Sequence, residues 1–451
     1  MTRFGFDTWL EDQRDVSLNN CDREPIHRPD SIQSHGALAV FSSDGTLIQR
    51  SDNLFAFLGL SSETAPASLF DRLANTDNRN HPFGIDRRNY RVHWHDMDAV
   101  RIAEIERNPG IDASAVLSKV AKATDALAGA ESEQDVYEAA VAAIRDITGF
   151  DRVLVYMFDA DGHGSVRAEA VSEGQDPMLG LHFPATDIPQ QARHLYTLQL
   201  SRQIRDALEA PIAITPARNP VTQRSLDMSL CRLRSSSPIH IEYLRNMGVR
   251  SSYSISLIER GKLVGLIACH HRSPMDLPFD MQLACELTGR TVSEHLARRN
   301  IVRWRNRRNR QLSAQIAMLS ELGDTRALST HNGPWEIIAS FVQCDALLVH
   351  YKGEKRVVGP NPGGSEGLWR AAANIAGRCV GAPSSCRDLR AVVDAAPAGG
   401  VLAIPIGSHG WLAWYRAELS ATIRWGGRPQ PDAGETLTPR ASFKVWTETA
   451  G

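Results

Sequence analysis

The stretch that decides the fold is SYSISLIERGKLVGLIACH, residues 252–270, in which two largely apolar runs flank a short polar connection. The runs 252–259 and 263–270 have the length and composition of ordinary strands. The tripeptide Arg260-Gly261-Lys262 suits a tight turn between them. We therefore predict an antiparallel hairpin, and with it a sheet near the middle of the chain.

The residues before this hairpin predict more of the same domain. Runs 152–158 and 165–171 read as a second strand pair, joined by the turn Asp159–Gly164. Upstream, residues 112–148 repeat apolar side chains at helical spacing, with a break at Gly129. Strands followed and preceded by such helices predict an α+β domain that extends to about residue 290.

The rest of the chain predicts two further domains and a connector. Residues 1–110 contain short strands, such as 37–41 and its return 46–48, and residues 325–451 again mix helix and strand patterns. Residues 285–322 contain no proline and predict one long helix. A length of 451 residues suggests about three domains. We place them at 1–110, 111–305 and 306–451.

Composition and charge favour a soluble globular protein. Apolar residues make up 42%, charged residues 23%, and the net charge is −2. No apolar run of about 18 residues and no signal-peptide pattern is present, so we expect a cytoplasmic protein without a membrane partner. An odd, scattered set of cysteines fits a reducing compartment. The seven are Cys21, Cys231, Cys269, Cys285, Cys344, Cys379 and Cys386.

Several functional classes find little support. Seven arginines between Arg298 and Arg310 have two interpretations, a solvated helix face or a nucleic-acid surface. The second would need a basic domain around it, so we expect no nucleic-acid partner. The sequence lacks a phosphate-binding glycine loop, a nucleophile elbow and a His-Glu metal helix. We therefore expect neither an enzyme nor a metal site.

Four motifs carry the chemistry of the chain. CDREPIHRP (21–29) precedes FPATDIPQQARHLY (183–196), LRSSSPIHIEYLRNMGV (233–249) and LVGLIACHH (263–271). Cys21 alone would be an idle or buried thiol. Together with its neighbours, however, the first motif resembles the chromophore-attachment segment of bacteriophytochromes, and the other three resemble the bilin-binding domain of phytochromes in the right order.

The resemblance implies a fold. We expect three successive PAS/GAF-like domains, namely PAS, GAF and PHY, each an antiparallel sheet flanked by helices, with the long helix as connector. In the family, the N-terminal segment threads through a loop of the central domain as a figure-of-eight knot, and Ile32 is expected near the crossing. Asp30 and Ser34 stand where family members generally have Gly and Pro, and we expect these changes to loosen the turn.

The resemblance also implies a pocket for a bilin. Two propionates require cations and hydroxyls, and the pyrrole nitrogens require acceptors and a titratable neighbour. His270 is expected to bond the carbonyl of ring D, and three tyrosines to wall that ring. By position, the cofactor-binding residues are Cys21, Tyr156, Asp187, Ile188, Tyr196, Arg202, Arg234, His240, Tyr243, Ser252, Ser254 and His270.

The choice of pigment depends on a cysteine that is missing. Plant and cyanobacterial phytochromes attach their bilins through a Cys immediately before the His of the central motif, and here that position is Ile239. Attachment through Cys21 implies biliverdin IXα in a thioether bond. Cys231 and Cys269 lie in the same domain and are the competing attachment sites.

The last domain resembles the tongue of phytochromes. Its signature residues are WGG (425–427), PRASF (439–443) and WTE (446–448). In the family, an arginine at the position of Arg440 pairs with the aspartate at the position of Asp187, and we assign Ser442 to the same switch. The chain ends three residues after Glu448, so we expect a third domain that is truncated at its C-terminus.

The function implied is that of a red/far-red photoreceptor. Light isomerises the bilin beside ring D, and the tongue and connector helix relay the change to an output partner, a histidine kinase or a response-regulator-type protein. We expect a homodimer that uses apolar positions of the connector helix, Leu312, Ile316 and Leu319. The alternative is a pigment-free module for small-ligand binding or dimerisation, since a shared scaffold does not determine function.

We predict that Cys21→Ser retains bilin non-covalently but abolishes the acid-stable adduct. The measurement is zinc-induced fluorescence of denatured protein on a gel after loading with biliverdin. Cys231→Ser and Cys269→Ser are the matched controls and should keep the adduct. An adduct that survives in Cys21→Ser would overturn the assignment.

Overall fold

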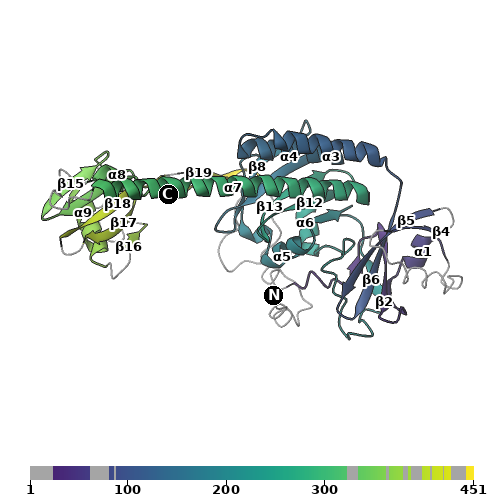
Figure 1. Ribbon diagram of the computed structural model, residues 1–451. Helices are drawn as coiled ribbons and strands as arrows, with labels where there is room; N and C mark the ends of the chain where they lie inside the picture. Colours follow the sequence, from purple (N-terminus) through teal and green to yellow (C-terminus); the bar gives the residue numbers. More distant parts are fainter. Residues whose placement is uncertain are drawn as a thin grey trace. The chain divides into compact units, whose positions relative to one another are not determined.

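The computed structural model of the chain falls into two compact units, Met1–Arg298 with Arg424–Thr447 and Arg299–Ile423 with Glu448–Gly451 (Figure 1). No helix in the described part of the chain is both long and apolar enough to cross a membrane. The residues that the structure describes are 24–60, 81–85, 88–321, 334–361, 365–378, 384–387, 399–406, 409–419, 421–427 and 443–450.

The first unit contains two sheets, and the first sheet is antiparallel with seven strands in the order β1-β11-β3-β2-β6-β5-β4. A short helix, α1 (Leu54–Leu58), covers a core that includes Phe41, Trp94 and Ile105. The predicted strands 37–41 and 46–48 are confirmed with small shifts. The strand bounds are β1 Ser31–Ile32, β2 Gly36–Ser42, β3 Leu47–Ser51, β4 His81–Ile85, β5 Arg88–Met97, β6 Val100–Arg107 and β11 Ile212–Thr215.

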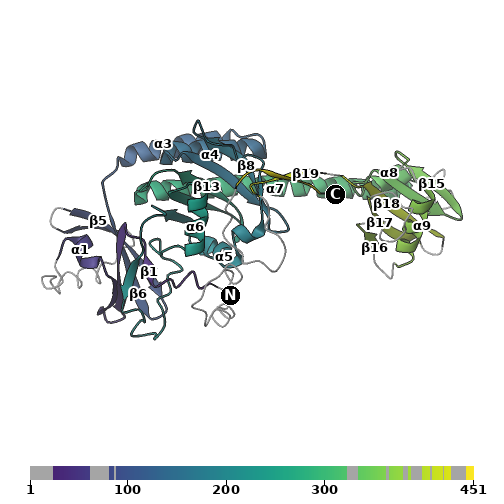
Figure 2. The ribbon, with the colours of Figure 1, turned by 180° about the vertical axis from the view of Figure 1, so that it is seen from behind.

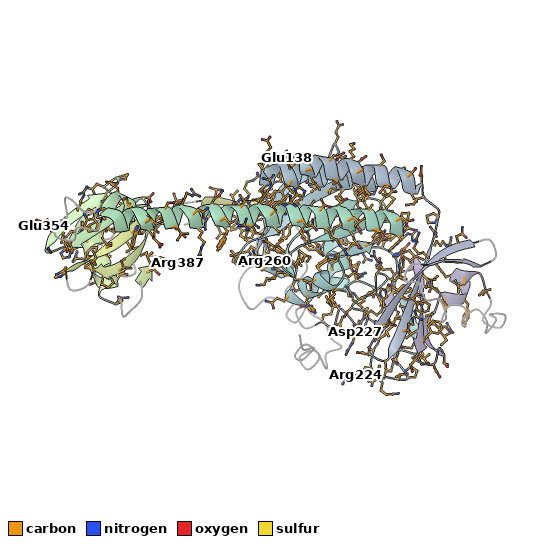
Figure 3. The ribbon with its side chains drawn as sticks, in the orientation of Figure 1. Glu138, Arg224, Asp227, Arg260, Glu354 and Arg387 are labelled. Atoms are coloured by element: carbon orange, nitrogen blue, oxygen red, sulfur yellow. The ribbon has the colours of Figure 1, made fainter. Side chains whose placement is uncertain are left out.

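Strand β11 belongs by sequence to the central domain, yet it pairs with β1 on one side and β3 on the other. Ile32 in β1 is fully buried and also forms an isolated bridge with Arg234. The N-terminal segment therefore runs between β11 and the return segment 224–235, on which Figure 3 marks Arg224 and Asp227. This is the place where Ile32 was expected, while the complete knot stays a prediction.

The turn before β1 differs from the expectation that Asp30 loosens it. Asp30 has a φ of 53°, in the left-handed region that glycine adopts without strain. Its carboxylate accepts a hydrogen bond of 3.0 Å from the Ser225 hydroxyl, and its carbonyl accepts one from the Ile214 amide. The turn is thus held on both sides, and asparagine and aspartate are the residues that tolerate this conformation best after glycine.

The second sheet contains the predicted hairpin and has the strand order β10-β12-β13-β7-β8-β9-β19-β20. Its core strands pair antiparallel, with Ser252 opposite His270 and His270 opposite Arg152. Both predicted strand pairs are therefore confirmed. The bounds are β7 Arg152–Phe158, β8 Gly164–Val171, β9 His182–Phe183, β10 Ser201–Ile204, β12 Ser251–Glu259, β13 Lys262–His271, β19 Ala421–Trp425 and β20 Trp446–Ala450.

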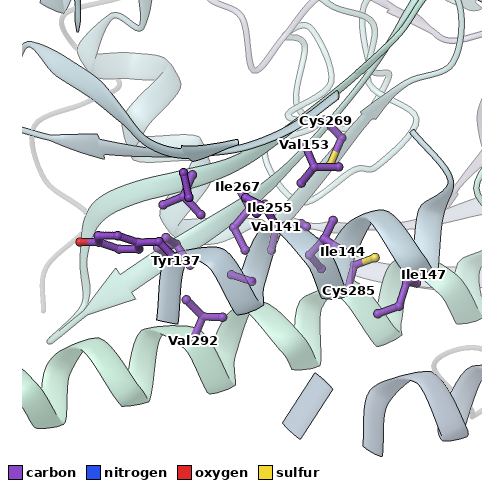
Figure 4. Close-up of a cluster of buried hydrophobic side chains, with 14 of the residues drawn as sticks. Tyr137, Val141, Ile144, Ile147, Val153, Ile255, Ile267, Cys269, Cys285 and Val292 are labelled. Carbon is purple, nitrogen blue, oxygen red and sulfur yellow. The ribbon is translucent and has the colours of Figure 1, made fainter. Parts of the chain in front are cut away.

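Two helices cover one face of this sheet, where the sequence predicts a helical stretch with a break. They are α3 (Ala113–Ala128) and α4 (Glu133–Thr148), which lie side by side. Asp112 caps α3, and Ser132 and Asp135 form a capping box on α4. Figure 4 shows how apolar side chains of α4 and of the long helix α7 meet those of the strands in one buried cluster.

Two shorter helices lie on the other face, α5 (Gln190–Leu198) and α6 (Pro238–Asn246), as both ribbon views show (Figures 1 and 2). Pro189 is the N-cap of α5 and Pro238 is the first residue of α6, where no intrahelical bond needs the missing amide. The 3-10 turn η2 (Ala185–Asp187) precedes α5. This face of the sheet is therefore enclosed by the segments that carry the quoted motifs.

The long helix α7 spans Phe279–Glu321, so it begins six residues before the predicted start at Cys285. In the second unit, a five-stranded sheet has the order β15-β14-β18-β17-β16. Its apolar residues form two clusters, one of which lies against α9. The bounds are α8 Trp335–Ala339, α9 Ser365–Ala376, β14 Ala346–Tyr351, β15 Glu354–Val358, β16 Ser384–Cys386, β17 Gly399–Ile406 and β18 Gly410–Ala417.

The backbone conformation of Asp30 predicts a difference between two substitutions. Asp30→Gly and Asp30→Ala both lose the bond to Ser225, but only alanine must pay for a positive φ, at roughly 1 to 2 kcal/mol. We therefore expect Asp30→Gly to have the higher free energy of unfolding by about 1 kcal/mol. Urea unfolding followed by tryptophan fluorescence measures the difference, and equal stabilities would contradict the assigned conformation.

Candidate functional site

The second sheet, which contains β12 and β13, has two chemically different faces. Along β12, Tyr253 and Ile255 are buried in the apolar cluster beneath α4 and α7. Side chains alternate along a strand, so Ser252 and Ser254 point to the opposite face. They are 6% and 9% exposed, and His270 lies beside Ser252 on β13. The alternation thus lines one enclosed face with polar groups.

Two arginines approach this polar face from different segments. Arg202 on β10 pairs in register with Ser254, and its guanidinium donates to the carbonyls of Arg234 and Ser235 and to the Ser236 hydroxyl. Arg234 is 5% exposed and donates to the carbonyl of Met228 at 3.2 Å. In the described part of the chain, neither guanidinium forms an ion pair with a carboxylate.

The electrostatics of this pair are unfavourable without an anion. Burial lowers the pKa of Arg202 to about 9, and the neighbouring charge of Arg234 adds to the effect. Burial also lowers the pKa of Arg234. Both groups remain cationic at neutral pH, and two buried like charges cost free energy unless a partner neutralises them. The arrangement therefore fits a ligand with one or more carboxylates.

Helix α6 presents two of the predicted residues on one side. His240 and Tyr243 are three positions apart, and their rings stack at 6.2 Å with an angle of 13°. The Tyr243 hydroxyl donates to Asp187 at 3.2 Å. Burial and the charge of Arg202 lower the pKa of His240 to about 4. The imidazole is therefore neutral at physiological pH and offers one donor and one acceptor.

His270 lies beside Ser252 on β13, near His240. Burial, together with the charge of Arg152 on the adjacent strand, lowers the pKa of His270 to about 3. Its Nδ1 is buried and has no hydrogen-bond partner among the described residues. A buried polar atom of this kind usually has a protein, water or ligand partner. His270 thus fits a position that bonds a ligand.

Of the three tyrosines predicted to wall ring D, Tyr243 stacks on His240 and Tyr156 belongs to an apolar cluster of the same sheet. Tyr156 is 7% exposed and packs against Phe158 and Phe183, with ring centroids 5.4 and 6.0 Å away. A Cβ on Gly164 would lie 2.2 Å from the Tyr156 ring, so this position requires glycine. Ile188 joins the same cluster. Tyr196 accepts a bond from Ser256 through its carbonyl.

The predicted attachment residue Cys21 lies outside the described residues, but its segment is anchored close by. Glu24 accepts a hydrogen bond of 2.6 Å from the hydroxyl of Ser237, the N-cap of α6. Cys21 is three residues away, a span of at most about 10 Å. The competing thiols of Cys231 and Cys269 are fully buried, and burial raises their pKa values well above the usual range. Both are therefore poor nucleophiles.

The predicted tongue residues are described only in part. Arg440 and Ser442 lie outside the described residues. Strands β19 and β20 are neighbours in the sheet, and Trp425 pairs with His182 of β9 in parallel. A Cβ on Gly426 would lie 2.5 Å from the Phe183 ring, so glycine permits this close contact. Phe443 packs edge-on against Tyr243 at 5.1 Å.

Sequence reasoning missed three residues of the site. Arg193 and His163 hold the turn that carries Asp187, and Arg152 adds charge beside His270. Arg193 lies within a quoted motif and His163 within a predicted turn, but neither position has a pattern that indicates its contacts. Arg152 begins a predicted strand, and only the strand register places it opposite His270.

Family models match most of the chain in order. A model described as PAS fold matches residues 21–78, the GAF domain matches 132–299, and the phytochrome region matches 310–451. A bacteriophytochrome of Pseudomonas aeruginosa is 33% identical over 470 residues, which cover 96% of this chain and 63% of the relative. Cyanobacterial phytochrome B of Nostoc sp. is 33% identical over 479 residues, with the same coverage. The chain thus spans less than two thirds of these relatives.

Solved structures agree with the sequence relatives. A bacteriophytochrome of R. palustris superposes with a TM-score of 0.78 at 30% identity and covers 96% of this chain and 94% of its own. The photosensory core module of a Stigmatella aurantiaca phytochrome has a TM-score of 0.76 at 33% identity, with 97% and 94% covered. These relatives imply a bilin chromophore, the kind of dicarboxylate that the pocket fits. The chain belongs to the phytochrome family and corresponds to the photosensory core of a bacteriophytochrome.

Proposed function

We propose that the chain is a red/far-red photoreceptor that carries biliverdin IXα in a thioether bond to Cys21. The observation that carries the proposal is the pair Arg202 and Arg234, two buried guanidiniums without a carboxylate partner in the described residues. A bilin supplies two propionates and a double bond beside ring D that isomerises in light. Fixed cations inside a mostly apolar enclosure suit such a ligand.

Each part of the polar face then has a task. Arg234 and Arg202 neutralise propionates, and the hydroxyls of Ser252 and Ser254 donate to the same groups. Because His240 is neutral, it can accept from a pyrrole N–H or donate to water without adding a third positive charge beside Arg202. His270 is likewise neutral and its Nδ1 is buried, which suits a bond to the ring D carbonyl.

Two observations support attachment through Cys21: the competing thiols are unreactive, and the segment that follows Cys21 is bonded near the polar face. The buried thiols of Cys231 and Cys269 are protonated and therefore unreactive. Glu24 is bonded at the N-terminus of α6, whose residue His240 lies on the polar face. Cys21 precedes this anchored residue by only three positions, which supports attachment there.

The relay beyond the pocket is the remaining part of the proposal. We assign the switch to Asp187, Arg440 and Ser442, and the transfer of the signal to the tongue and to α7. Leu312 and Ile316 of α7 are 44% and 65% exposed, so they are available for a parallel partner helix in a homodimer. The output partner is a histidine kinase or a response-regulator-type protein, and the domain boundaries are 1–110, 111–305 and 306–451.

The lowered pKa values of the two histidines predict a pH dependence of stability. In the unfolded chain a histidine binds its proton below a pH of about 6.5, whereas folded His240 and His270 bind theirs only near 4 and 3. The unfolded state thus binds more protons in this window, and stability falls as the pH falls. The loss is about 1 kcal/mol per pH unit for each histidine.

We therefore expect His270→Asn in the pigment-free protein to flatten the decline in the free energy of unfolding between pH 6 and pH 4.5, by about 1 kcal/mol per unit. Urea unfolding at several pH values measures the slope. His194→Asn, on the exposed side of α5, is the control and should keep the wild-type slope. An unchanged slope in His270→Asn would show that the buried imidazole titrates normally.

The proposed function is tested by one spectroscopic experiment. The chain is expressed with biliverdin, and absorption is recorded in darkness, after red light and after far-red light. We expect a covalently pigmented protein whose red and far-red bands interconvert. Pigment uptake with no light-induced change would favour the alternative, a small-ligand-binding or dimerisation module, and absence of uptake would refute the pocket.

A further inference from the structure

The turn that carries Asp187 is too short to hold itself in place. η2 comprises only Ala185–Asp187, and its backbone forms one internal bond, from the Asp187 amide to the Pro184 carbonyl at 3.1 Å. A single 3-10 turn of this kind has little intrinsic stability. The position of Asp187 must therefore be determined by the residues around the turn.

Arg193, in the first turn of α5, supplies the larger share of these contacts. Its Nε donates to the Ile188 carbonyl at 2.7 Å, and its Nη2 donates to the Ala185 carbonyl at 3.2 Å and to the Gly162 carbonyl at 2.7 Å. The guanidinium thus bonds carbonyls on both sides of Asp187. In the described part of the chain it has no ion-pair partner, so its planar group of donors is used for geometry alone.

The third carbonyl connects this contact to the loop between β7 and β8. Gly162 and the next residue, His163, belong to a tight turn, in which the Asp159 amide donates to the His163 carbonyl and the Gly162 amide donates to the Asp159 carbonyl. The Arg193 guanidinium also lies 4.2 Å from the centre of the Phe158 ring, at the end of β7. Arg193 is therefore held on the sheet while it holds the turn.

His163 adds a second contact from the same loop. Its Nδ1 accepts the amide hydrogen of Ala185 at 3.1 Å, which places the proton of the neutral ring on Nε2. Its ring meets the Trp425 indole edge-on, with centroids 5.4 Å apart. Trp425 is fixed in turn by the bond from the Gly426 amide to the His182 carbonyl at 2.9 Å. The His163 imidazole thus contacts both Ala185, the first residue of the turn, and Trp425, the last residue of β19.

We propose that Arg193 and His163 are positioning residues of the photoswitch. Arg193 fixes the backbone on both sides of Asp187, and His163 makes the start of the turn sensitive to the position of Trp425. A shift of β19 relative to β9 moves the indole against His163 and alters the bond to Ala185. This inference rests on the proposed function, because only a light-driven change gives the connection a task.

The test compares variants that differ in one hydrogen bond. His163→Leu removes the acceptor, whereas His163→Asn keeps an acceptor at a similar distance from the backbone. Arg193→Lys keeps the charge but replaces the planar fork by a single nitrogen, which cannot occupy the positions of both Nε and Nη2. Arg167→Gln is the matched control, because Arg167 is half-exposed and pairs with Asp159 at the other side of the same loop.

Hydrogen exchange in darkness tests the geometry without any need for light. We expect the Ala185 amide to exchange about tenfold faster in His163→Leu and Arg193→Lys, with no change in the hairpin of β12 and β13, which reports global stability. His163→Asn and Arg167→Gln should retain the wild-type rate. Faster exchange throughout the hairpin as well, or equal rates in the Leu and Asn variants, would overturn the positioning role.

Trp425→Leu tests the connection to β19. Loss of the indole should raise exchange at Ala185 as well, through its ring contact with His163. If Ala185 exchanges at the wild-type rate in this variant, the proposed sensitivity to Trp425 is wrong. Should His163→Leu fail to fold, Arg193→Lys and Trp425→Leu still decide the question.

Illumination of the biliverdin-loaded protein provides the functional arm. We expect His163→Leu and Arg193→Lys to bind as much pigment as wild type but to form less than about half of its far-red-absorbing product, with His163→Asn restored. A wild-type yield in both variants would contradict the proposal. If wild type itself shows no light-induced change, the proposed function fails, and the exchange measurement still decides whether the contacts position the turn.

Discussion

The alternation of side chains along β12 and β13 is the constraint on which the rest of the structure depends. Tyr253 and Ile255 complete an apolar cluster with α4 and α7, while Ser252 and Ser254, one position away, face the enclosed polar side. A register slip of one residue would exchange the two sets and destroy both. The same strand therefore contributes to the stability of the domain and to the chemistry of its pocket.

On the polar side, the hydrogen-bond donors of the two arginines are satisfied, but their positive charges are not neutralised by the described residues. Arg202 and Arg234 are held by backbone carbonyls, which satisfy donors but do not neutralise charge. Glu104 could have paired with either, yet its oxygens accept from His95 and from the amides of Arg232 and Leu233. This buried carboxylate is thus bonded to His95 and to the return segment 224–235. A dicarboxylate ligand would neutralise the two buried positive charges and so remove the free-energy cost of keeping them together.

Sequence patterns predicted most of the central domain because its signals are local. Apolar runs on either side of turn residues located both hairpins, and a helical repeat located the stretch that forms α3 and α4, whose caps the structure places at Asp112 and Ser132. They could not place β11 in the first sheet, since pairing between distant strands has no local signature. The start of α7 was missed by six residues, because its first turn contains no clear apolar period.

The candidate site was predicted mainly by resemblance, and the physical reasons for each residue came from the structure. Sequence indicated Arg234 and His270 as types of group, but not that, among the described residues, Arg234 has no carboxylate partner and the Nδ1 of His270 has no hydrogen-bond partner. The roles of Arg193 and His163 could not be predicted from the sequence, because both residues form hydrogen bonds with backbone atoms, which every residue has. Such bonds depend on how two loops pack against each other, and the identity of a residue alone does not determine that packing.

The N-terminal segment explains why the first two domains form one compact unit. Glu24 bonds Ser237 at the start of α6, and Ile32 bridges to Arg234, so two points of this segment touch neighbours of pocket residues. The Asp30 turn between them is held by β11 and Ser225. Displacing the first domain would therefore pull on Arg234 and on α6 at once. The segment thus contacts both the start of α6 and Arg234, so the proposed boundary near residue 110 would not separate it from the candidate site.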